Sequence, residues 1–259
     1  IYKWAARKDY IATYAERFGY SRLENYDFLF TSEPGRCRVI EIWRKEQKPR
    51  YRCHDYQNGD IFKIDEEQVQ LMKRRGGVGH DLSHIRPKGS PVKNSALTST
   101  GLVPFMERYS NSTREVAQDG RRGALMLSVS IKHPDSEAFI DAKMTEGKVT
   151  GANVSVKLDD AFMQAAVNGT PYKQQYPVDS DQPVFTKDID ASALWKKIVH
   201  NAWKSAEPGV LFWDTIIRES VPDCYADLGY RTVSTNPCGE IPLCPYDSCR
   251  LLAINLYSY

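Results

Sequence analysis

Long apolar runs are missing from this chain of 259 residues. No stretch approaches the ~18 consecutive apolar residues that a membrane-spanning helix needs, and the first residues show no signal-peptide pattern. These absences argue against a membrane protein and a secreted protein. We therefore expect a globular, soluble protein of the reducing cytoplasm, with no membrane partner.

A charge excess is missing as well, because 35 Lys and Arg face 33 Asp and Glu. This balance gives no reason to expect nucleic acid as a partner. The six cysteines are Cys37, Cys53, Cys224, Cys238, Cys244 and Cys249. They lack the paired spacing of a zinc site, and the chain is too long to depend on a secreted disulfide framework. The sequence therefore predicts no metal site.

What the sequence does contain is a short stretch of reactive side chains. Asn236, Cys238 and Glu240 occupy alternate positions, so an extended backbone would send all three to one face. Pro237 and Gly239 between them favour a rigid loop that a substrate can approach closely. The trio offers a sulfur that can be a nucleophile or a radical, a carboxylate that can move a proton and an amide that can hold hydroxyl groups. In an isolated Asn-x-Cys-x-Glu, a buried cysteine and a surface glutamate would be the commoner outcome.

The surrounding residues reverse that preference. Residues 236–243 are Asn-Pro-Cys-Gly-Glu-Ile-Pro-Leu, and residues 246–251 are Tyr-Asp-Ser-Cys-Arg-Leu. Together they resemble the finger loop of the ribonucleotide reductase large subunit, most closely its adenosylcobalamin-dependent (class II) branch. The resemblance covers about residues 62–259. It implies an α/β barrel with a central finger loop. Since the chain begins at Ile1 and stops at Tyr259 in an apolar alternating run, we expect only an incomplete portion of that barrel.

The resemblance also implies a reaction, the reduction of ribonucleotides to deoxyribonucleotides for DNA synthesis by a ribonucleoside-diphosphate reductase. A thiyl radical on Cys238 would abstract the 3′ hydrogen, Glu240 would relay a proton from the 3′ hydroxyl, and Asn236 would hold the sugar. The expected substrate-binding residues are Gly77, Asn236, Pro237, Cys238, Gly239 and Glu240. Adenosylcobalamin, or a separate metal-containing subunit, would supply the radical. Whether diphosphates or triphosphates are reduced stays open, and the whole protein is expected to be a homodimer.

Two further segments resemble the effector loops of the same family. Arg86 and Lys88 follow the Gly-Gly-x-Gly turn among Gly, Ser and Pro, a basic setting that suits a polyphosphate. An ordinary solvated turn is the alternative. Residues 145–151 would form the second effector loop, with Lys148 as its contact. The implied effectors are deoxynucleoside triphosphates or ATP.

The electrons for reduction would come from a dithiol that includes Cys249, recharged by a thioredoxin-like reductant. The family pairs this cysteine with one upstream of the Gly-Gly-x-Gly turn, and Cys53 lies 23 residues before Gly76. Cys53 is therefore the expected partner, although it could instead be a plain hairpin cysteine. Two other functions stay open. The chain could be a truncated, non-catalytic nucleotide-binding remnant fused to a foreign leader, or a thiol-disulfide oxidoreductase using Cys238 and Cys249.

Residues 1–61 carry no reductase motif. Their pattern predicts a helix over Ile1–Gly19 and a basic hairpin with strands at Cys37–Trp43 and Arg50–Cys53. We expect them to be a leader of unclear origin, separate from a partial barrel domain over residues 62–259.

Beyond the leader, strands and helices are expected to alternate. Strands are predicted at residues 125–131 and 153–158, and helices at residues 101–120, 136–144, 160–169, 191–206 and 213–220. Asp65 should cap a helix over residues 66–75, and residues 170–188 should form a loop.

Three ionisable residues are expected to be structural. His133, next to Pro134, should be a turn residue, because nothing nearby completes a triad or a metal site. Asp159 and Asp160 should cap a helix rather than act as an acid/base pair.

Overall fold

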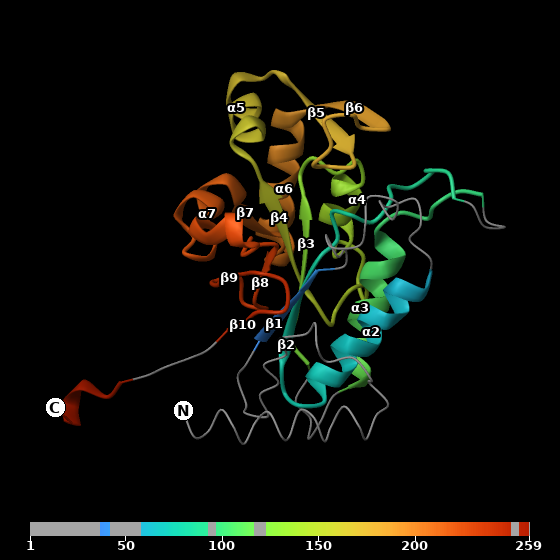
Figure 1. Ribbon diagram of the computed structural model, residues 1–259. Helices are drawn as coiled ribbons and strands as arrows, with labels where there is room; N and C mark the ends of the chain where they lie inside the picture. Colours follow the sequence, from blue (N-terminus) through green and yellow to red (C-terminus); the bar gives the residue numbers. More distant parts are fainter. Residues whose placement is uncertain (1–36, 42–57, 93–96, 117–122, 250–253, 259) are drawn as a thin grey trace.

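The computed structural model describes residues 37–41, 58–92, 97–116, 123–249 and 254–258 (Figure 1). The main sheet has the strand order β10 (Ser248–Cys249), β1 (Cys37–Glu41), β2 (Gly77–Asp81), β3 (Leu125–Ser130), β4 (Asn153–Leu158) and β7 (Gly209–Phe212). Strands β1, β2, β3, β4 and β7 are parallel, and β10 pairs antiparallel with β1. Parallel strands joined by helical crossovers build an α/β barrel. The predicted fold class, an incomplete α/β barrel, is confirmed.

Helices connect the parallel strands. They are α2 (Asn58–Met72), α3 (Val103–Glu115), α4 (Ser136–Asp141), α5 (Asp160–Asn168) and α6 (Ala191–Ser205). After β7, the last parallel strand, come α7 (Trp213–Glu219) and the 3-10 helices η2 (Pro222–Leu228) and η3 (Leu256–Ser258). The β4–β7 connection also contains an antiparallel hairpin of β5 (Pro171–Tyr176) and β6 (Phe185–Asp190). Within the described ranges, no helix has both the length and the apolar character that crossing a membrane requires.

The two faces of the sheet carry different side chains. One face supplies the main core, with Leu125, Leu127 and Val129 of β3 and Val154, Val156 and Leu158 of β4. The alternate positions are Met126, Ser128 and Ser130 in β3 and Asn153, Ser155 and Lys157 in β4. Since side chains alternate across a strand, this second face is polar except for Met126. It is the face on which the segment carrying Cys238 lies.

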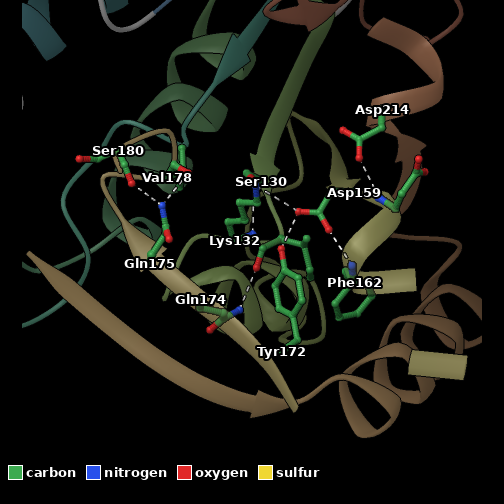
Figure 2. Close-up of polar contacts among 12 residues, drawn as sticks. Ser130, Lys132, Asp159, Phe162, Tyr172, Gln174, Gln175, Val178, Ser180 and Asp214 are labelled. Atoms are coloured by element: carbon green, nitrogen blue, oxygen red, sulfur yellow. Dashed lines mark hydrogen bonds and ion pairs between the residues drawn. The ribbon is translucent and has the colours of Figure 1, made fainter. Parts of the chain in front are cut away.

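Helix α5 begins and ends as the sequence predicts. Asp159 is the N-cap, and its Oδ1 accepts a hydrogen bond of 2.7 Å from the backbone N–H of Phe162. Gly169 ends the helix with a φ of 67°, which glycine adopts without strain. Figure 2 shows that the Asp159 carboxylate also accepts a hydrogen bond from Tyr172, at 2.6 Å. The capping role of Asp159 is confirmed.

Two local predictions are wrong. Asp65 is not a cap, because α2 begins at Asn58 and Asp65 lies inside it, paired with Arg108 at 2.7 Å. Residues 170–188 are not a loop, because they contain most of the β5–β6 hairpin. The buried, polar Gln174 hid the strand alternation; its Nε2 donates to the Ile131 carbonyl and the Ser136 hydroxyl.

The first strand of the hairpin expected in the leader exists as β1, which pairs with β2 along its length and with β10 at Cys37 and Arg38. The expected second strand at residues 50–53 and the expected helix at residues 1–19 lie outside the described residues, so the hairpin stays a prediction. Strand β1 therefore belongs to the same sheet as the strands after residue 62. The boundary at residue 61 stays a prediction.

Candidate active site

Cys238 lies at the tip of a short hairpin, which we call the cysteine hairpin (residues 233–243). Its arms are β8 (Ser234–Thr235) and β9 (Pro242–Leu243), paired antiparallel. The N–H of Gly239 donates to the carbonyl of Asn236 at 2.9 Å, which closes a four-residue turn around Cys238. Proline at the second position and glycine at the fourth suit such a turn.

Because of this turn, the three reactive side chains do not leave on one face, and that prediction is wrong. Asn236 points inward and is 1 % exposed, whereas Cys238 and Glu240 are exposed. The Asn236 Oδ1 accepts from the Ile241 N–H at 3.0 Å, and its Nδ2 donates to the Cys249 sulfur at 3.9 Å. Asn236 therefore stiffens the hairpin and joins it to Cys249.

Two side chains of the sheet hold the hairpin directly. Asn153, at the start of β4, donates from Nδ2 to the carbonyl of Pro237 at 2.8 Å. The hydroxyls of Ser128 in β3 and Ser234 in β8 are 3.2 Å apart. The residue beside Cys238 is thus tied to one strand and the base of the hairpin to the next.

Strand β2 holds the hairpin by close backbone approach. A Cβ atom on Gly79 would lie 2.0 Å from the carbonyl oxygen of Thr235, far inside van der Waals contact. Only glycine lets the two backbones meet in this way. Gly79 lies in the same Gly-Gly-x-Gly segment as the predicted Gly77. It is therefore a second glycine of the candidate site.

A buried ion pair lies below the hairpin. Lys157 of β4 and Asp81 of β2 are joined by an Nζ–Oδ2 distance of 2.9 Å, and Lys157 also donates to the carbonyl of Val233. Burial alone would raise the pKa of the Asp81 carboxyl, but attraction to Lys157 and His84 and a hydrogen bond from Ser83 outweigh it and lower the pKa. Asp81 is therefore ionised at neutral pH.

Cys249 is buried in β10, and the strand registers align its backbone with that of Cys37 and Gly77. In the strand registers, Cys249 lies opposite Cys37 of β1, and Cys37 lies opposite Gly77 of β2. The expected partner Cys53 lies outside the described residues. The register instead brings the backbone of a different cysteine, Cys37, beside Cys249.

The other described cysteines fit redox chemistry less well. Burial, together with the negative charges of Asp247 and Asp223, raises the pKa of the Cys244 thiol to about 11. It stays protonated and is a poor nucleophile. Cys224 is exposed, and its thiol contacts the Val221 carbonyl in its own turn. In the part of the chain that is described, no three His, Cys, Asp or Glu side chains gather as a metal site would require.

Helix α3 connects the two predicted effector loops. Lys88 donates from its backbone N to Asp135, whose carboxylate also accepts from the N–H of Leu102 just before α3. Lys148 pairs with Glu107 of α3 at 3.0 Å. Arg86 is half-buried, and its carbonyl accepts from the Ser99 hydroxyl at 3.2 Å.

The second loop contacts α3, and the strand that follows the loop contacts the site. Ser110 accepts from the N–H of Gly151 at 2.8 Å, and Arg114 donates to Thr150 at 3.0 Å. Asn153, which begins β4 two residues further on, donates to the Pro237 carbonyl. Residues 145–151 are therefore tied to a helix on one side and lead directly into a contact with the hairpin that carries Cys238.

His133 is structural, as expected. It is fully buried, its Nε2 donates to the Ile85 carbonyl at 2.7 Å, and its Nδ1 accepts from the N–H of Asp135 at 3.0 Å. Burial lowers the pKa of the imidazole to about 4, even though the Ile85 hydrogen bond and Asp135 oppose this shift. His133 is neutral at pH 7 and fixes the turn after β3.

Three residues of the candidate site were not predicted from the sequence: Lys157, Asn153 and Gly79. The signal was present, because Asn153, Ser155 and Lys157 alternate with the apolar residues of β4. Polar side chains at alternate positions of an otherwise apolar, buried strand indicate that one face of the sheet is not covered by the apolar side of a helix.

Comparisons with known proteins agree with the motifs. Residues 54–259 match the family model described as the barrel domain of ribonucleotide reductase. A vitamin B12-dependent ribonucleoside-diphosphate reductase of Thermoplasma acidophilum is 37% identical over 202 residues, which is 77% of this chain and 25% of that protein. A protein of the same name from Mycobacterium tuberculosis (strain CDC 1551) is 34% identical over 199 residues, 76% of this chain and 28% of its own length.

A more distant relative is the ribonucleoside-diphosphate reductase NrdEB subunit alpha of Bacillus subtilis. It is 26% identical over 180 residues, 65% of this chain and 17% of that protein. This chain spans about a quarter of the length of the first two relatives.

Proposed function

This chain belongs to the ribonucleotide reductase family, and from that premise we propose that the protein containing it reduces ribonucleotides to deoxyribonucleotides by radical chemistry at Cys238. The observation that carries the proposal is the placement of this residue. Its thiol is exposed at the tip of a turn that β2, β3 and β4 hold in place. A fixed, accessible sulfur is what hydrogen abstraction from a bound sugar requires.

The neighbouring residues take the supporting roles. Cys238, as a thiyl radical, abstracts the 3′ hydrogen of the ribose, and Glu240, exposed two residues away, relays the proton of the 3′ hydroxyl. We propose that Asn236, besides holding the sugar, keeps Cys238 in register with Cys249 through its contact with the Cys249 sulfur. Gly77, Pro237 and Gly239 complete the substrate-binding residues.

Adenosylcobalamin is the proposed radical source, as the names of the Thermoplasma and Mycobacterium relatives suggest. When bound, it supplies a radical that side chains cannot generate unaided. The exposed thiol of Cys238 fits this role, since a buried sulfur could not be reached from outside the hairpin. We assign no described residue to holding the corrin ring.

The two reducing electrons come from a dithiol, which is oxidised to a disulfide as the 2′ hydroxyl leaves as water. We propose Cys249 as one member and Cys37 as the other. Directly opposed residues of antiparallel strands have Cα atoms about 4.5–5.5 Å apart, within the ~7 Å that a disulfide allows. Cys53 is the alternative partner. A thioredoxin-like protein would restore the dithiol.

The remaining parts of the proposal concern ligands and assembly. Ribonucleoside diphosphates are the proposed substrates, as in the relatives' names. Arg86, Lys88 and Lys148 are the proposed contacts for deoxynucleoside triphosphate or ATP effectors, and both of their loops meet α3 or its start. A homodimer in a reducing cytoplasm is the proposed setting.

The test is product formation. The product of the complete reading frame is incubated with a ribonucleoside diphosphate, adenosylcobalamin and a dithiol, and deoxyribonucleotide is measured by chromatography. We expect product only when all three are present. Turnover of a generic disulfide without nucleotide would favour a thiol-disulfide oxidoreductase, and nucleotide binding without any product would favour a non-catalytic remnant.

A further inference from the structure

Lys157 is a charged side chain inside the sheet, where a charge is costly unless its partners compensate it. Its side chain is 5 % exposed, and that of Asp81 is 8 % exposed. Strands β4 and β2 are not neighbours, because β3 lies between them. The ion pair therefore spans the second, mainly polar face of the sheet, underneath the cysteine hairpin.

The ammonium group of Lys157 has partners on three separate elements. One is the carboxylate of Asp81 and another is the carbonyl of Val233. The third is the ring of Trp213, the first residue of α7, with Nζ 3.9 Å from the ring centroid. An ammonium has three N–H donors, and this arrangement gives each of them a target.

The Asp81 carboxylate is also fixed in place by hydrogen bonds. Its Oδ1 accepts from the N–H of Ser83 at 3.1 Å and from the Ser83 hydroxyl at 2.6 Å. The same hydroxyl accepts from the N–H of Ser130 at 2.8 Å. The negative partner of Lys157 is thus fixed by β2 and β3, and it cannot follow a moving hairpin.

The contact with Val233 distinguishes this pair from an ordinary buried salt bridge. A buried ion pair can often be replaced by apolar residues with little loss of stability. An apolar residue could not donate to a carbonyl. Val233 begins the cysteine hairpin five residues before Cys238, and its own N–H bonds the Leu243 carbonyl across the hairpin at 3.0 Å.

We propose that Lys157 is a positioning residue for Cys238, which acts by anchoring the base of the cysteine hairpin to β4 through the Val233 carbonyl. The inference rests on the proposed function in one respect, that Cys238 is the reacting group. Lys157 acts through backbone and touches no reacting atom.

The test distinguishes two roles of Lys157: anchoring the cysteine hairpin and neutralising the buried charge of Asp81. In the single variant Lys157→Met, Asp81 would be left buried without its counter-charge, and the chain could fail to fold. The double variant Asp81→Asn/Lys157→Met removes both charges together. Lys157→Arg keeps a cation and its donors, and Lys132→Met is a matched control, since Lys132 pairs with Asp159 at 3.7 Å and is half-exposed.

Amide hydrogen exchange of the 259-residue chain is the first readout. In the double variant, the amides of Val233 and Asn236 should exchange at least about tenfold faster, while those of β5–β6 stay within about twofold of wild type. Lys157→Arg and Lys132→Met should match wild type. Unchanged exchange at Val233 would overturn the proposal. An equal rise throughout the chain would also overturn it, because Lys157 would then serve the stability of the whole sheet.

Turnover of the complete protein is the second readout. The double variant should lose about tenfold in kcat with KM within about twofold, because Lys157 contacts no substrate. If the wild-type protein shows no reductase activity while the exchange result holds, the proposed function fails and the anchor stands. An active wild type together with an unaltered kcat in the double variant would refute the anchor.

Discussion

The buried imidazole of His133 makes the stability of this chain depend on pH. Its pKa in the folded chain is lowered to about 4, whereas an unfolded histidine titrates near 6.5. Between these values the unfolded state binds more protons, so the free energy of unfolding rises with pH. The contribution is fully present above the unfolded pKa and is lost as the pH falls towards 4.

We predict that lowering the pH from 7 to 5 costs about 2 kcal/mol through this residue alone. Urea unfolding of wild type and His133→Gln at both pH values measures it. The variant should be less stable at pH 7, because it loses the Ile85 contact, but its stability should fall less steeply with pH. Equal pH slopes in the two proteins would show that His133 is not the titrating group.

Gly79 sets how closely β2 and the cysteine hairpin approach each other. Gly79→Ala would place a Cβ 2.0 Å from the Thr235 carbonyl, so β2 and β8 must separate. We predict a loss of about 1–3 kcal/mol in the free energy of unfolding and faster amide exchange in the cysteine hairpin. Gly209→Ala is the control, since its nearest neighbour is the movable Ser155 hydroxyl at 2.7 Å. If the two variants behaved alike, the close approach of Gly79 would have no special role.

At the scale of elements, the loop at residues 145–151 and the start of β4 connect α3 with the cysteine hairpin. Three residues of α3 contact the loop: Glu107, Ser110 and Arg114. Asn153 then reaches the Pro237 carbonyl, next to Cys238. A ligand that moves this loop would therefore shift a residue in direct contact with the turn that carries Cys238.

We predict that Asn153→Ala weakens the coupling between effector and substrate binding more than it weakens either binding event alone. The measurement is a binding cycle in the complete protein, with substrate affinity determined with and without effector. The coupling should fall by about 1 kcal/mol, the size of one hydrogen bond. Asn168→Ala, at the exposed end of α5, should leave it unchanged. Undiminished coupling in Asn153→Ala would show that Asn153 does not transmit the effect of the effector to the substrate site.

Helices and strands with a regular spacing of apolar residues were predictable from the sequence. Strand β4 and helix α5 have the expected bounds because apolar alternation, an aspartate cap and a terminal glycine act locally. The β5–β6 hairpin was hidden because Gln174 is buried through hydrogen bonds to other segments, which a local pattern does not reveal. The turn at Cys238 was read as extended for a similar reason, since its partners lie on β2, β3 and β4. The motifs identify a candidate site, but the geometry of that site depends on strands that are distant in the sequence.

At the scale of the molecule, the candidate site exists only when the sheet is assembled. The hairpin that carries Cys238 is held by β2, β3 and β4, which are separated by long stretches of chain and lie side by side in Figure 1. The strand order places the Cys37–Cys249 pairing at one side of the sheet and Lys157 further in. A local change in any of these strands should therefore affect Cys238 through the hairpin.

Radical chemistry at Cys238 can be tested by a single substitution. Deoxyribonucleotide formation is measured for Cys238→Ser in the complete protein with adenosylcobalamin and a dithiol. Cys224→Ser is the control, since both thiols are exposed. Serine keeps the shape of the side chain but cannot carry the radical at accessible energy. We predict that Cys238→Ser binds nucleotide almost normally and forms no product above background, while Cys224→Ser stays active. Turnover of Cys238→Ser above a few per cent of wild type would contradict the account.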